Sequence, residues 1–580
     1  MSGAGTIRAT LLAFCLAAAA SAQQAADTVA PEQGGAAVAK VGPPVTAQDW
    51  MVVAANPLAS KAGARVLREG GTAADAMVAV QLVLGLVEPQ SSGLGGGAFL
   101  VWYDGTTGAL TTLDARETAP LSATPRLFQD AEGAPLKFFD AVVGGRSVGA
   151  PGTPMLLQEA HRRWGRANWP SLFDEALHHA DAGFTVSPRM AASIAENADT
   201  LARFDTTAAY FLPGGTPLPA GHLLRNPAYA DSLRAFAAQG AAPFYTGDIA
   251  AQIVQAVQGA DGVLSAMDLA LYRVKDRPAV CGPYRAYQIC GMGPPSSGAI
   301  SVGQTLGALQ DYDLTALGPD SATAWRLIGD ASRLAFADRG RFIADSDYVP
   351  VPVQGMLTDS YLMDRGALLA GDDALPEVAP GSPEFDHALL WGDDDAIELP
   401  STSHISIVDQ YGNALSMTTT IENAFGSRVM AGGFLLNNEL TDFSFRSHDA
   451  GVPIANRVEP GKRPRSSMAP TIVLKDGGPV LVLGSPGGSR IIPYVAKTVI
   501  AVLDWGLDVQ AAVALPHLVN RWGTYDIEAG TTAETLADPL RAMGYEVNVR
   551  DLNSGLHAIA IGADLQGGAD PRREGMALGE

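Results

Sequence analysis

Alternating apolar and polar positions stand out most clearly between residues 399 and 443. Residues 404–408, His-Ile-Ser-Ile-Val, alternate with a period of two. Residues 414–420 resume a strand-like pattern after the polar segment Asp409–Asn413. Two such runs joined by a short turn-forming segment are typical of a β-hairpin. We therefore predict a hairpin here, with Thr402 at the head of its first strand.

Helical spacing of apolar residues dominates much of the remaining chain. Segments 56–69 and 72–87 are predicted helices, with Thr72 as the N-cap of the second, and the pattern from 188 to 370 is mostly helical. Downstream of Thr402, strands are predicted at 433–438, 471–475 and 480–484, and helices at 491–505 and 509–515. Nearly continuous apolar strands between helices predict an α/β (α+β) protein with sheets covered on both faces.

Length and composition describe a folded globular protein. The chain has 580 residues, of which 47% are hydrophobic and 17% charged. This length exceeds one ordinary core, so either one large layered domain or two subdomains are expected. The formal net charge of −22 repels phosphate backbones, which argues against nucleic acid as a partner.

The N-terminus has the three parts of a secretory signal peptide. Arg8 precedes an apolar run, residues 9–20, which is too short to span a bilayer and ends in an Ala-Ser-Ala cleavage site. We predict a signal peptide over 1–22 and a periplasmic or secreted protein; an uncleaved anchor is the alternative. Residues 23–45 are expected to be a flexible leader. The mature chain offers no long uncharged apolar segment, so no membrane span is expected.

Two cysteines remain after removal of the signal peptide. Cys281 and Cys290 bracket a segment that could turn tightly, and the oxidising compartment makes a disulfide plausible; two buried thiols are the equal alternative. Two cysteines cannot form a structural zinc site alone, and the nine histidines show no H-E-x-x-H spacing. We predict neither a catalytic metal nor a cofactor.

Three short motifs are better explained by structure than by catalysis. Residues 145–149 match G-x-S-x-G, but no strand-turn-helix context surrounds them. The glycines of 93–98 precede a strand where a dinucleotide site needs a helix, so close backbone packing is the better interpretation. His178 and His179 lie on a predicted helix, where a surface or packing role is expected.

Thr402 allows a chemical interpretation beside a structural one. β-branched residues suit strands, so a strand-leading threonine is ordinarily structural. Cleavage of the preceding peptide bond would instead free an α-amine, with an unperturbed pKa of ~7.7–8.0, beside the Thr402 hydroxyl. Such an amine can act as the base for its own nucleophile.

Spaced motifs around Thr402 favour the chemical interpretation. They occur in the order T-S-H-x-S-x-V-D-x-x-G-N, T-T-T-I, F-G-S, L-N-N-E-L-T-D-F-S, K-R-P-R-S-S-M-x-P-T and G-S-P-G-G-S-R. This chain therefore resembles the γ-glutamyltransferase (γ-glutamyltranspeptidase) family, which includes related cephalosporin acylases. The resemblance covers nearly the whole mature chain. It implies the N-terminal nucleophile (Ntn) hydrolase fold, an αββα sandwich of two stacked sheets between helical layers.

The resemblance also implies that the precursor cuts itself between Ser401 and Thr402. The products would be a large subunit, 23–401, and a small catalytic subunit, 402–580, which stay together as a heterodimer. The acidic stretch 371–400, rich in proline and glycine, is expected to be a linker. Flexibility there would let the new chain end leave the site.

The family motifs assign roles to ten residues. Thr402 is the implied nucleophile, Thr420 its hydrogen-bonding partner, and Gly487 and Gly488 the oxyanion donors. For the amino acid head of the donor, the implied carboxylate ligands are Arg116 and the serine pair Ser466 and Ser467. The implied ammonium ligands are the acidic residues Glu439, Asp442 and Glu422.

Three features depart from the family pattern. Glu422 stands where many members have asparagine, and it either strengthens ammonium binding or becomes protonated beside Asp442 and Glu439. The segment from Ser444 to Lys462 is short for a lid, and Pro516-His517 replaces the usual Pro-Arg. These departures concern donor and acceptor preference rather than acyl-transfer chemistry.

The resemblance implies an enzyme that transfers the γ-glutamyl group of glutathione and other γ-glutamyl amides. The acceptor would be water, an amino acid or a dipeptide. Two alternatives are a glutaryl-type cephalosporin acylase of the same superfamily and a non-catalytic, uncleaved binding protein. Retention of Asp442 favours a donor with an ammonium group over the acylase, and Thr402 with its partners argues against the binding protein.

Overall fold

The structure is a computed structural model that describes residues 42–387, 390–399 and 401–580. The predicted signal peptide and all but the end of the predicted leader lie outside these residues. Within the described ranges, no helix is both long and apolar enough to cross a membrane.

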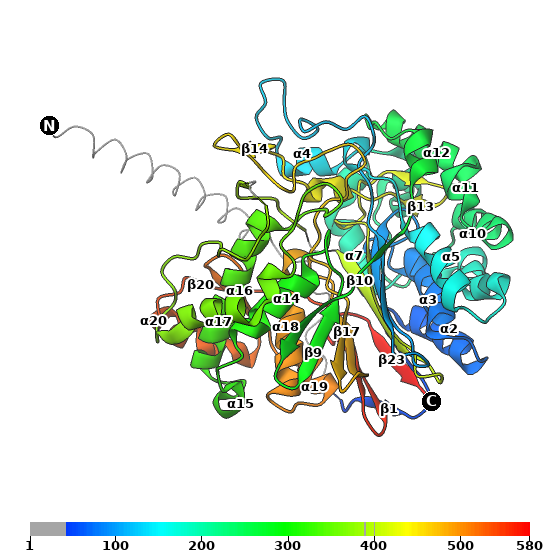
Figure 1. The fold of residues 1–580 in the computed structure, drawn as a ribbon. Helices are drawn as coiled ribbons and strands as arrows, with labels where there is room; N and C mark the ends of the chain where they lie inside the picture. Colours follow the sequence, from blue (N-terminus) through cyan, green and yellow to red (C-terminus); the bar gives the residue numbers. More distant parts are fainter. Residues whose placement is uncertain (1–41, 388–389, 400) are drawn as a thin grey trace.

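Two seven-stranded antiparallel sheets stack face to face at the centre of the molecule (Figure 1). The first runs in the order β1 (Val45–Ala47), β22 (Leu565–Ala569), β21 (His557–Ile561), β17 (Gly478–Gly484), β16 (Thr471–Lys475), β9 (Tyr287–Gly291) and β8 (Val280–Tyr284). The second runs in the order β23 (Met576–Gly579), β2 (Met51–Ala54), β10 (Thr402–Val408), β11 (Ala414–Thr420), β3 (Gly97–Tyr103), β4 (Leu110–Ala115) and β7 (Lys275–Arg277).

Helical layers cover the outer face of each sheet. The second sheet is covered by helices that include α2 (Pro57–Arg68), α3 (Ala73–Val87), α5 (Thr153–Trp164), α6 (Asp174–Ala182), α10 (Pro227–Gln239) and α12 (Asp248–Gly259). The first sheet is covered by α14 (Gly298–Ala308), α16 (Ala322–Phe342), α18 (Ile491–Leu503) and α19 (Val509–Ala514). The predicted αββα sandwich is therefore confirmed.

Shorter elements connect these layers. The short helices are α4 (Phe138–Val142), α7 (Pro188–Glu196), α8 (Ala198–Leu201), α9 (Asp205–Phe211), α11 (Ala242–Tyr245), α13 (Ala266–Leu271), α15 (Leu314–Leu317), α17 (Asp359–Ala367) and α20 (Ala537–Ala542). The minor strands are β5 (Phe184–Thr185), β6 (Leu223–Leu224), β12 (Met430–Ala431), β13 (Phe434–Leu435), β14 (His448–Asp449), β15 (Val452–Pro453), β18 (Leu518–Asn520), β19 (Tyr525–Glu528) and β20 (Val547–Arg550).

Strands with two buried faces explain the near-continuous apolar runs. On β2, Val52 packs with the helices while Met51 and Val53 face the other sheet. Val482 of β17 lies in the same intersheet core. Because successive side chains of a strand point to opposite faces, both sets must be apolar here.

Local sequence signals fix the first helices and the central hairpin. Asn56 and Thr72 cap α2 and α3 through their side chains, as predicted for Thr72. β10 pairs with β11 so that Thr402 lies directly opposite Thr420, and the Asp409 carboxylate closes the intervening turn through the Asn413 amide. The predicted hairpin is confirmed.

The segment 188–370 is mostly helical, as predicted, although short strands within it extend the large sheets: β7 joins the second sheet, and β8 and β9 join the first. One strand prediction was wrong in its extent. The strand predicted over 433–438 is reduced to Phe434–Leu435, because the following Asn437 and Asn438 side chains bond to neighbouring backbone groups instead. The two cysteines meet across β8 and β9 and form a disulfide, Cys281–Cys290.

The motifs interpreted as structural have structural roles. A Cβ on Gly96 would lie 1.9 Å from the Thr420 carbonyl oxygen, so close backbone packing accounts for this glycine. The Ser147 hydroxyl is buried and donates to the carbonyls of Val142 and Gly144, so it is not an exposed nucleophile.

Candidate active site

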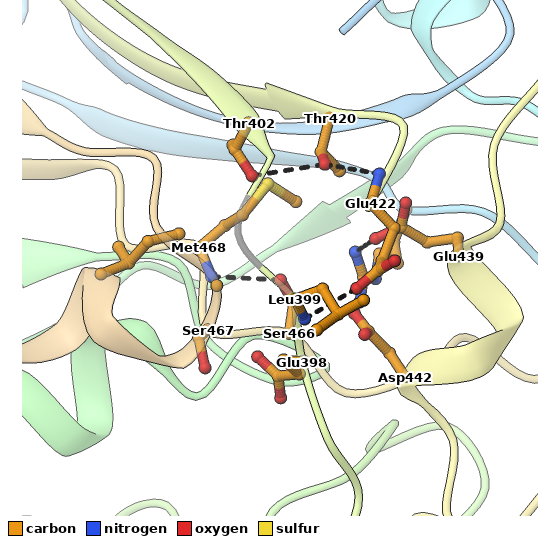
Figure 2. Close-up of a pocket in the computed structure, with 13 residues that line it drawn as sticks. Glu398, Leu399, Thr402, Thr420, Glu422, Glu439, Asp442, Ser466, Ser467 and Met468 are labelled. Carbon is orange, nitrogen blue, oxygen red and sulfur yellow. Dashed lines mark hydrogen bonds and ion pairs between the residues drawn. The ribbon is translucent and has the colours of Figure 1, made fainter. Parts of the chain in front are cut away.

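Thr402 and Thr420 meet at the ends of two paired central strands. Thr402 Oγ1 donates to Thr420 Oγ1 over 3.4 Å, and Thr420 Oγ1 donates to the Ser401 carbonyl oxygen over 2.9 Å (Figure 2). The Glu422 amide donates to the same Thr420 oxygen over 2.8 Å. One hydroxyl thus touches the implied nucleophile and the carbonyl that precedes it, and a backbone amide orients it.

Two further contacts hold the chain on either side of the Ser401–Thr402 bond. The Ser401 hydroxyl donates to the Gln90 carbonyl over 2.6 Å, and Arg573 Nη1 donates to the Thr402 carbonyl over 2.9 Å. All four residues are buried. Neither Gln90 nor Arg573 lies in a motif that sequence reasoning singled out.

Gly487 and Gly488 pass close to the chain just before Thr402. Both have positive φ, of 139° and 57°, a region that favours glycine. A Cβ on Gly488 would lie 2.7 Å from the Leu399 carbonyl oxygen and 2.8 Å from that of Glu398. Backbone groups can therefore approach the acyl position only because no side chain intervenes.

His517, one of the departures from the family pattern, supports the turn at Gly487 and Gly488 through Tyr494. Its ring is buried and packs against the Tyr494 ring at a tilt of 35°, with centroids 4.0 Å apart. The Tyr494 ring in turn lies 2.9 Å from where a Gly487 Cβ would be. His517 Nε2 bonds to the Ser554 hydroxyl over 2.7 Å, so its role is in positioning rather than substrate contact.

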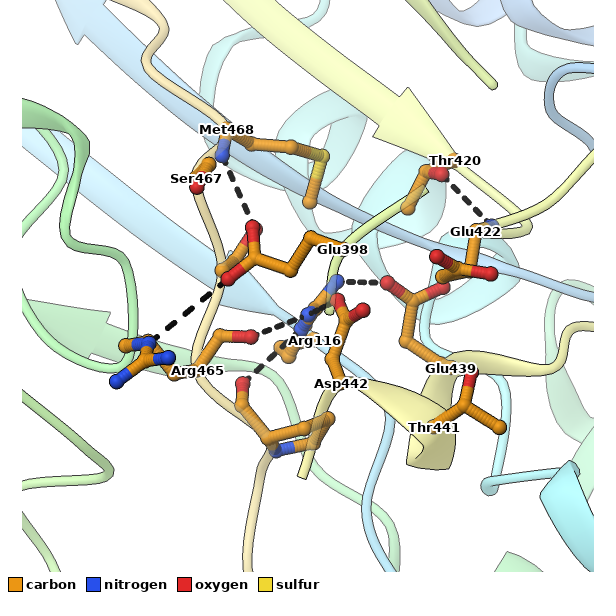
Figure 3. A network of polar contacts seen from close by, with 12 residues as sticks. Arg116, Glu398, Thr420, Glu422, Glu439, Thr441, Asp442, Arg465, Ser467 and Met468 are labelled. Carbon is orange, nitrogen blue, oxygen red and sulfur yellow. Dashed lines mark hydrogen bonds and ion pairs between the residues drawn. The ribbon is translucent and has the colours of Figure 1, made fainter. Parts of the chain in front are cut away.

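Arg116 lies between the two acidic residues that sequence reasoning assigned to the ammonium. Its guanidinium forms ion pairs with Glu439 and Asp442, and it also donates to the carbonyls of Pro464 and Arg465 (Figure 3). The implied carboxylate and ammonium ligands are therefore brought together as the motifs predict, but they are paired with each other in the uncut chain.

The two acids retain acceptor atoms for a cationic group. Glu439 Oε2 and Asp442 Oδ1 are buried and have no hydrogen-bond partner among the described residues. Burial raises the pKa of Asp442 to about 7, against the lowering effect of Arg116. An ammonium that binds here would supply the missing donors and favour the ionised carboxylate.

Glu422 is buried in the lining of the same pocket. Burial, followed by repulsion from Asp442, raises the pKa of the Glu422 carboxyl well above its ordinary value. This direction favours the protonated form of Glu422, the second of the two alternatives that the sequence left open. Its Oε1 accepts the Leu399 amide over 2.9 Å, and the Asn438 side-chain amide donates to its other oxygen.

The serine pair faces the pocket beside the stretch that leads to Ser401. Ser466 Oγ accepts the Met468 amide over 3.1 Å, and Ser467 Oγ accepts from Arg339 Nη2 over 2.9 Å. Ser467 also bonds to the Glu398 carboxylate. The ten motif residues thus lie around the end of β10, nine of them directly on one pocket wall, which includes Arg116, Thr402, Thr420, Glu422, Glu439, Asp442, Ser466, Ser467 and Gly488.

The end of the acidic stretch occupies this pocket, which sequence reasoning did not foresee. Glu398 and Leu399 line it, and Figure 2 shows them below Thr402 and beside the serine pair. Acidic residues of the stretch are tied down by buried arginines: Glu398 pairs with Arg339, and Asp394 with Arg465. The described part of 371–400 contains no helix or strand, as expected of a loop.

Within the described ranges, no group of three or more His, Cys, Asp or Glu side chains could hold a metal ion. The hydroxyl, guanidinium, carboxyl and glycine-backbone groups around Thr402 instead suit acyl transfer to a threonine.

Comparisons with known proteins agree with this geometry. The gamma-glutamyltranspeptidase family model matches residues 59–580. The "Glutathione hydrolase proenzyme" of Bacillus subtilis (strain 168) is 36% identical over 547 residues, which cover 92% of each chain. The "Acylase ACY 1 proenzyme" of Pseudomonas sp. (strain V22) is 34% identical over 92% of this chain and 94% of its own. The crystal structure of cephalosporin acylase from Bacillus halodurans superposes with a TM-score of 0.82 at 25% identity, and it covers 93% of this chain and 98% of that one.

Proposed function

The chain belongs to the gamma-glutamyltranspeptidase family, and from this premise we propose that it cuts itself before Thr402 and then transfers γ-glutamyl groups from glutathione and related amides. The acceptor is water, an amino acid or a dipeptide. The two chains produced, ending at Ser401 and beginning at Thr402, remain together as a heterodimer. The name "proenzyme" of its relatives supports processing.

One observation carries this proposal: Thr420 Oγ1 contacts both Thr402 Oγ1 and the Ser401 carbonyl oxygen. A donor on the carbonyl oxygen stabilises the negative charge that develops when the carbonyl is attacked. Its contact with the hydroxyl orients the attacking atom. A threonine that served only to fill the strand would need neither contact.

Maturation begins with attack of Thr402 Oγ1 on the Ser401 carbonyl carbon. The C–O bond forms, the C–N bond to Thr402 breaks, and the hydroxyl proton passes to the departing nitrogen, which becomes a free amine. Water then hydrolyses the ester, which restores the threonine hydroxyl and leaves a carboxylate on Ser401. The new amine lies on the same residue as the nucleophile and can serve as its base.

Turnover repeats this chemistry on a γ-glutamyl amide. Thr402 Oγ1 forms an ester with the γ-carbonyl, and the amine part of the donor leaves with a proton. Water or an acceptor amine then takes the acyl group. Backbone amides near Gly487 and Gly488 stabilise the oxyanion, since these glycines leave room for the tetrahedral centre.

The donor's amino acid head is recognised through both of its charges. The unpartnered oxygens of Glu439 and Asp442 support binding of the ammonium. Ser466 and Ser467, with an arginine, bind the carboxylate. The test is release of the aniline from a γ-glutamyl anilide by the purified cut enzyme, with and without a dipeptide acceptor; no release in either case would refute the proposal.

A second candidate is a side-chain acylase, favoured by the similarity to cephalosporin acylase. A glutaryl donor carries the carboxylate but no ammonium, so Glu439 Oε2 and Asp442 Oδ1 would stay unpartnered in its complex. We therefore expect turnover of γ-glutamyl amides to exceed that of glutaryl amides by at least roughly tenfold, because buried unpaired carboxylate oxygens are costly.

We also propose that the protein is exported to the periplasm or secreted. The charged, apolar and Ala-Ser-Ala segments of residues 1–22 support this, although they lie outside the described residues. The Cys281–Cys290 disulfide supports an oxidising compartment. Fractionation of expressing cells, followed by mass analysis of the large chain, tests both export and removal of residues 1–22.

A further inference from the structure

The backbone of the serine pair is held by the turn that precedes α14. The Ser466 carbonyl accepts both the backbone N–H and the hydroxyl of Ser297, each over 2.8 Å, and the Ser466 amide donates to the Pro295 carbonyl over 3.0 Å. The Ser296 hydroxyl donates to the Met468 carbonyl over 2.7 Å. The turn therefore fixes the chain on both sides of Ser467.

Arg339 of α16 extends this support to the Ser467 side chain. Its Nε donates to Ser297 Oγ over 2.8 Å, and its Nη2 donates to Ser467 Oγ over 2.9 Å. Arg339 is 3% exposed and does not line the pocket itself. Burial and the neighbouring Arg465 lower the pKa of Arg339 to about 10, so its guanidinium keeps every N–H at neutral pH.

This contact decides the direction of the Ser467 hydroxyl. An arginine side chain only donates hydrogen bonds, so the Ser467 oxygen accepts from Arg339 and the Ser467 hydrogen is left for another acceptor. In the uncut chain that acceptor is the Glu398 carboxylate, which lies beside Ser467 in Figure 3. Ser466 Oγ likewise accepts the Met468 amide over 3.1 Å. Both hydroxyls are thus left to donate.

A carboxylate needs donors of this kind, because it only accepts hydrogen bonds. An N–H that donates to a hydroxyl oxygen also polarises the O–H and strengthens the bond which that hydroxyl donates. The ion pair of Arg339 with Glu398 is lost when the acidic stretch leaves the pocket. The bonds of Arg339 to Ser297 and Ser467 involve no atom of that stretch, so they can remain in the cut enzyme.

We infer that Arg339 is a positioning residue for donor recognition, which holds the Ser467 hydroxyl as a hydrogen-bond donor toward the α-carboxylate of the γ-glutamyl group. Arg339 acts through Ser467 and does not touch the donor. The inference rests on the proposed function, which places this carboxylate at the serine pair. It adds the group that directs one of the two hydroxyls.

The first experiment is a double-mutant cycle on cut enzymes, with a γ-glutamyl anilide as donor. We expect Arg339→Met to raise KM by roughly tenfold, the usual effect of losing a charged hydrogen bond, with kcat nearly unchanged because recognition and not chemistry is lost. Ser467→Ala should behave in the same way. The double variant should have a KM within about threefold of that of Ser467→Ala, because Arg339 acts through the missing hydroxyl.

Two results of this cycle would overturn the inference. Losses that multiply in the double variant would show that Arg339 acts independently of Ser467. An unchanged KM in Arg339→Met, or a loss that falls equally on kcat, would remove its role in recognition. Absence of aniline release from the wild-type enzyme would instead refute the proposed function.

Arg333→Met is the matched control for Arg339→Met. Arg333 is a buried arginine of the same helix, pairs with Asp330 over 2.8 Å and does not line the pocket. Its loss removes the same kind of buried ion pair, so stability should fall while KM stays at the wild-type value. A rise in KM as large as that of Arg339→Met would overturn the inference, because it would be a general effect of damage to α16.

Ser297→Ala decides the matter without removal of a charge, even where Arg339→Met fails to fold or to be cut. It frees Arg339 Nε from its anchor and should raise KM by roughly threefold to tenfold, the usual effect of losing a neutral hydrogen bond. Most of this rise should vanish in the Ser467→Ala background. Ser301→Ala is its control: Ser301 lies on α14, is buried, and its hydroxyl has no hydrogen-bond partner among the described residues. An unchanged KM in Ser297→Ala, an equal rise in Ser301→Ala, or a rise that persists in full without the Ser467 hydroxyl would overturn the inference.

Discussion

Thr420 Oγ1 donates a 2.9 Å hydrogen bond to the carbonyl oxygen of Ser401, the group that the neighbouring Thr402 hydroxyl would attack. The pairing register of β10 with β11 produces this contact, since Thr402 and Thr420 are direct partners at the ends of the two strands. A one-residue slip would turn Thr420 to the opposite face. The central sheet therefore sets the geometry of the candidate reaction.

Loss of the Thr420 hydroxyl should slow cleavage without unfolding the protein. We expect Thr420→Val to reduce the rate of cleavage by roughly a hundredfold or more, as is typical when one oxyanion donor is removed. Appearance of the two chains on a denaturing gel over time measures this rate.

Thr419→Val is the control for that change. Thr419 is the preceding residue on β11, equally buried, and its hydroxyl has no hydrogen-bond partner among the described residues. It should be cut at nearly the wild-type rate. Equal rates for the two variants would remove Thr420 from the mechanism.

Gly488→Ala should impair cleavage through a steric clash. The added methyl would meet the carbonyl oxygens of Leu399 and Glu398 at 2.7 and 2.8 Å, so the chain before the cut must move. We expect roughly tenfold slower cleavage, which corresponds to a rise of about 1.4 kcal/mol in the activation free energy, because the reacting groups are misplaced. The same time course on a gel measures it.

Gly506→Ala separates the clash from backbone strain. Gly506 has a φ of 64°, similar to the 57° of Gly488, but nothing lies within 4 Å of its added Cβ. It should lose some stability and keep the wild-type cleavage rate. A slow Gly506→Ala variant would show that strain alone explains the effect.

Glu117 should make stability depend on pH. Burial raises the pKa of its carboxyl to about 8 from an ordinary 4.5, with Arg116 opposing the shift, and neither oxygen has a hydrogen-bond partner among the described residues. The folded protein thus holds a proton that the unfolded chain releases. Its stabilising contribution is full below pH 4.5 and is lost as the pH rises toward 8, at a slope of up to about 1.4 kcal/mol per pH unit.

Glu117→Gln should remove that slope. We expect the variant to gain stability relative to its parent as the pH is raised from 5 to 8. Both proteins should carry Thr402→Ala, so that unfolding in denaturant is measured on single uncut chains. Parallel pH dependences would contradict the assignment of a protonated Glu117.

The Cys281–Cys290 disulfide should contribute locally to stability. It closes a short loop between β8 and β9 at the edge of the first sheet. Replacing both cysteines with serine should cost roughly 2–3 kcal/mol in the unfolding free energy, the range for a loop of this length. Cleavage should proceed unchanged, because the pair lies at the edge of the first sheet, whereas Thr402 lies on a central strand of the second. A large loss of cleavage would indicate a wider role.

The sequence predicted the residues of the site better than their contacts. Thr402, Thr420, Arg116 and Asp442 lie together because the hairpin pattern and the ordered motifs specify the end of the central sheet. The ion pairs of Arg116 with Glu439 and Asp442 could not be predicted, because the arginine and the two acids lie in separate motifs. Neither motif indicates which side-chain rotamers the other adopts. Ion pairs between such distant segments are decided by packing.

Other failures have similar physical causes. The sequence indicated a possible tight turn between Cys281 and Cys290, but not the pairing of β7, β8 and β9 with the large sheets, because these strands are short and tertiary pairing decides their conformation. The acidic stretch was interpreted as a linker because its charges alternate with prolines and glycines. Its carboxylates at 394 and 398 are instead buried against Arg465 and Arg339. No local pattern distinguishes an acid with a buried partner from a solvated one.

The most direct test of the whole account is intact mass measurement and N-terminal sequencing of the active, purified enzyme. We expect two chains, with the smaller one beginning at Thr402 and carrying the γ-glutamyl ester when trapped during turnover. An active enzyme in which residue 402 is still joined to Ser401 would contradict the central claim that this threonine acts through its own free amine.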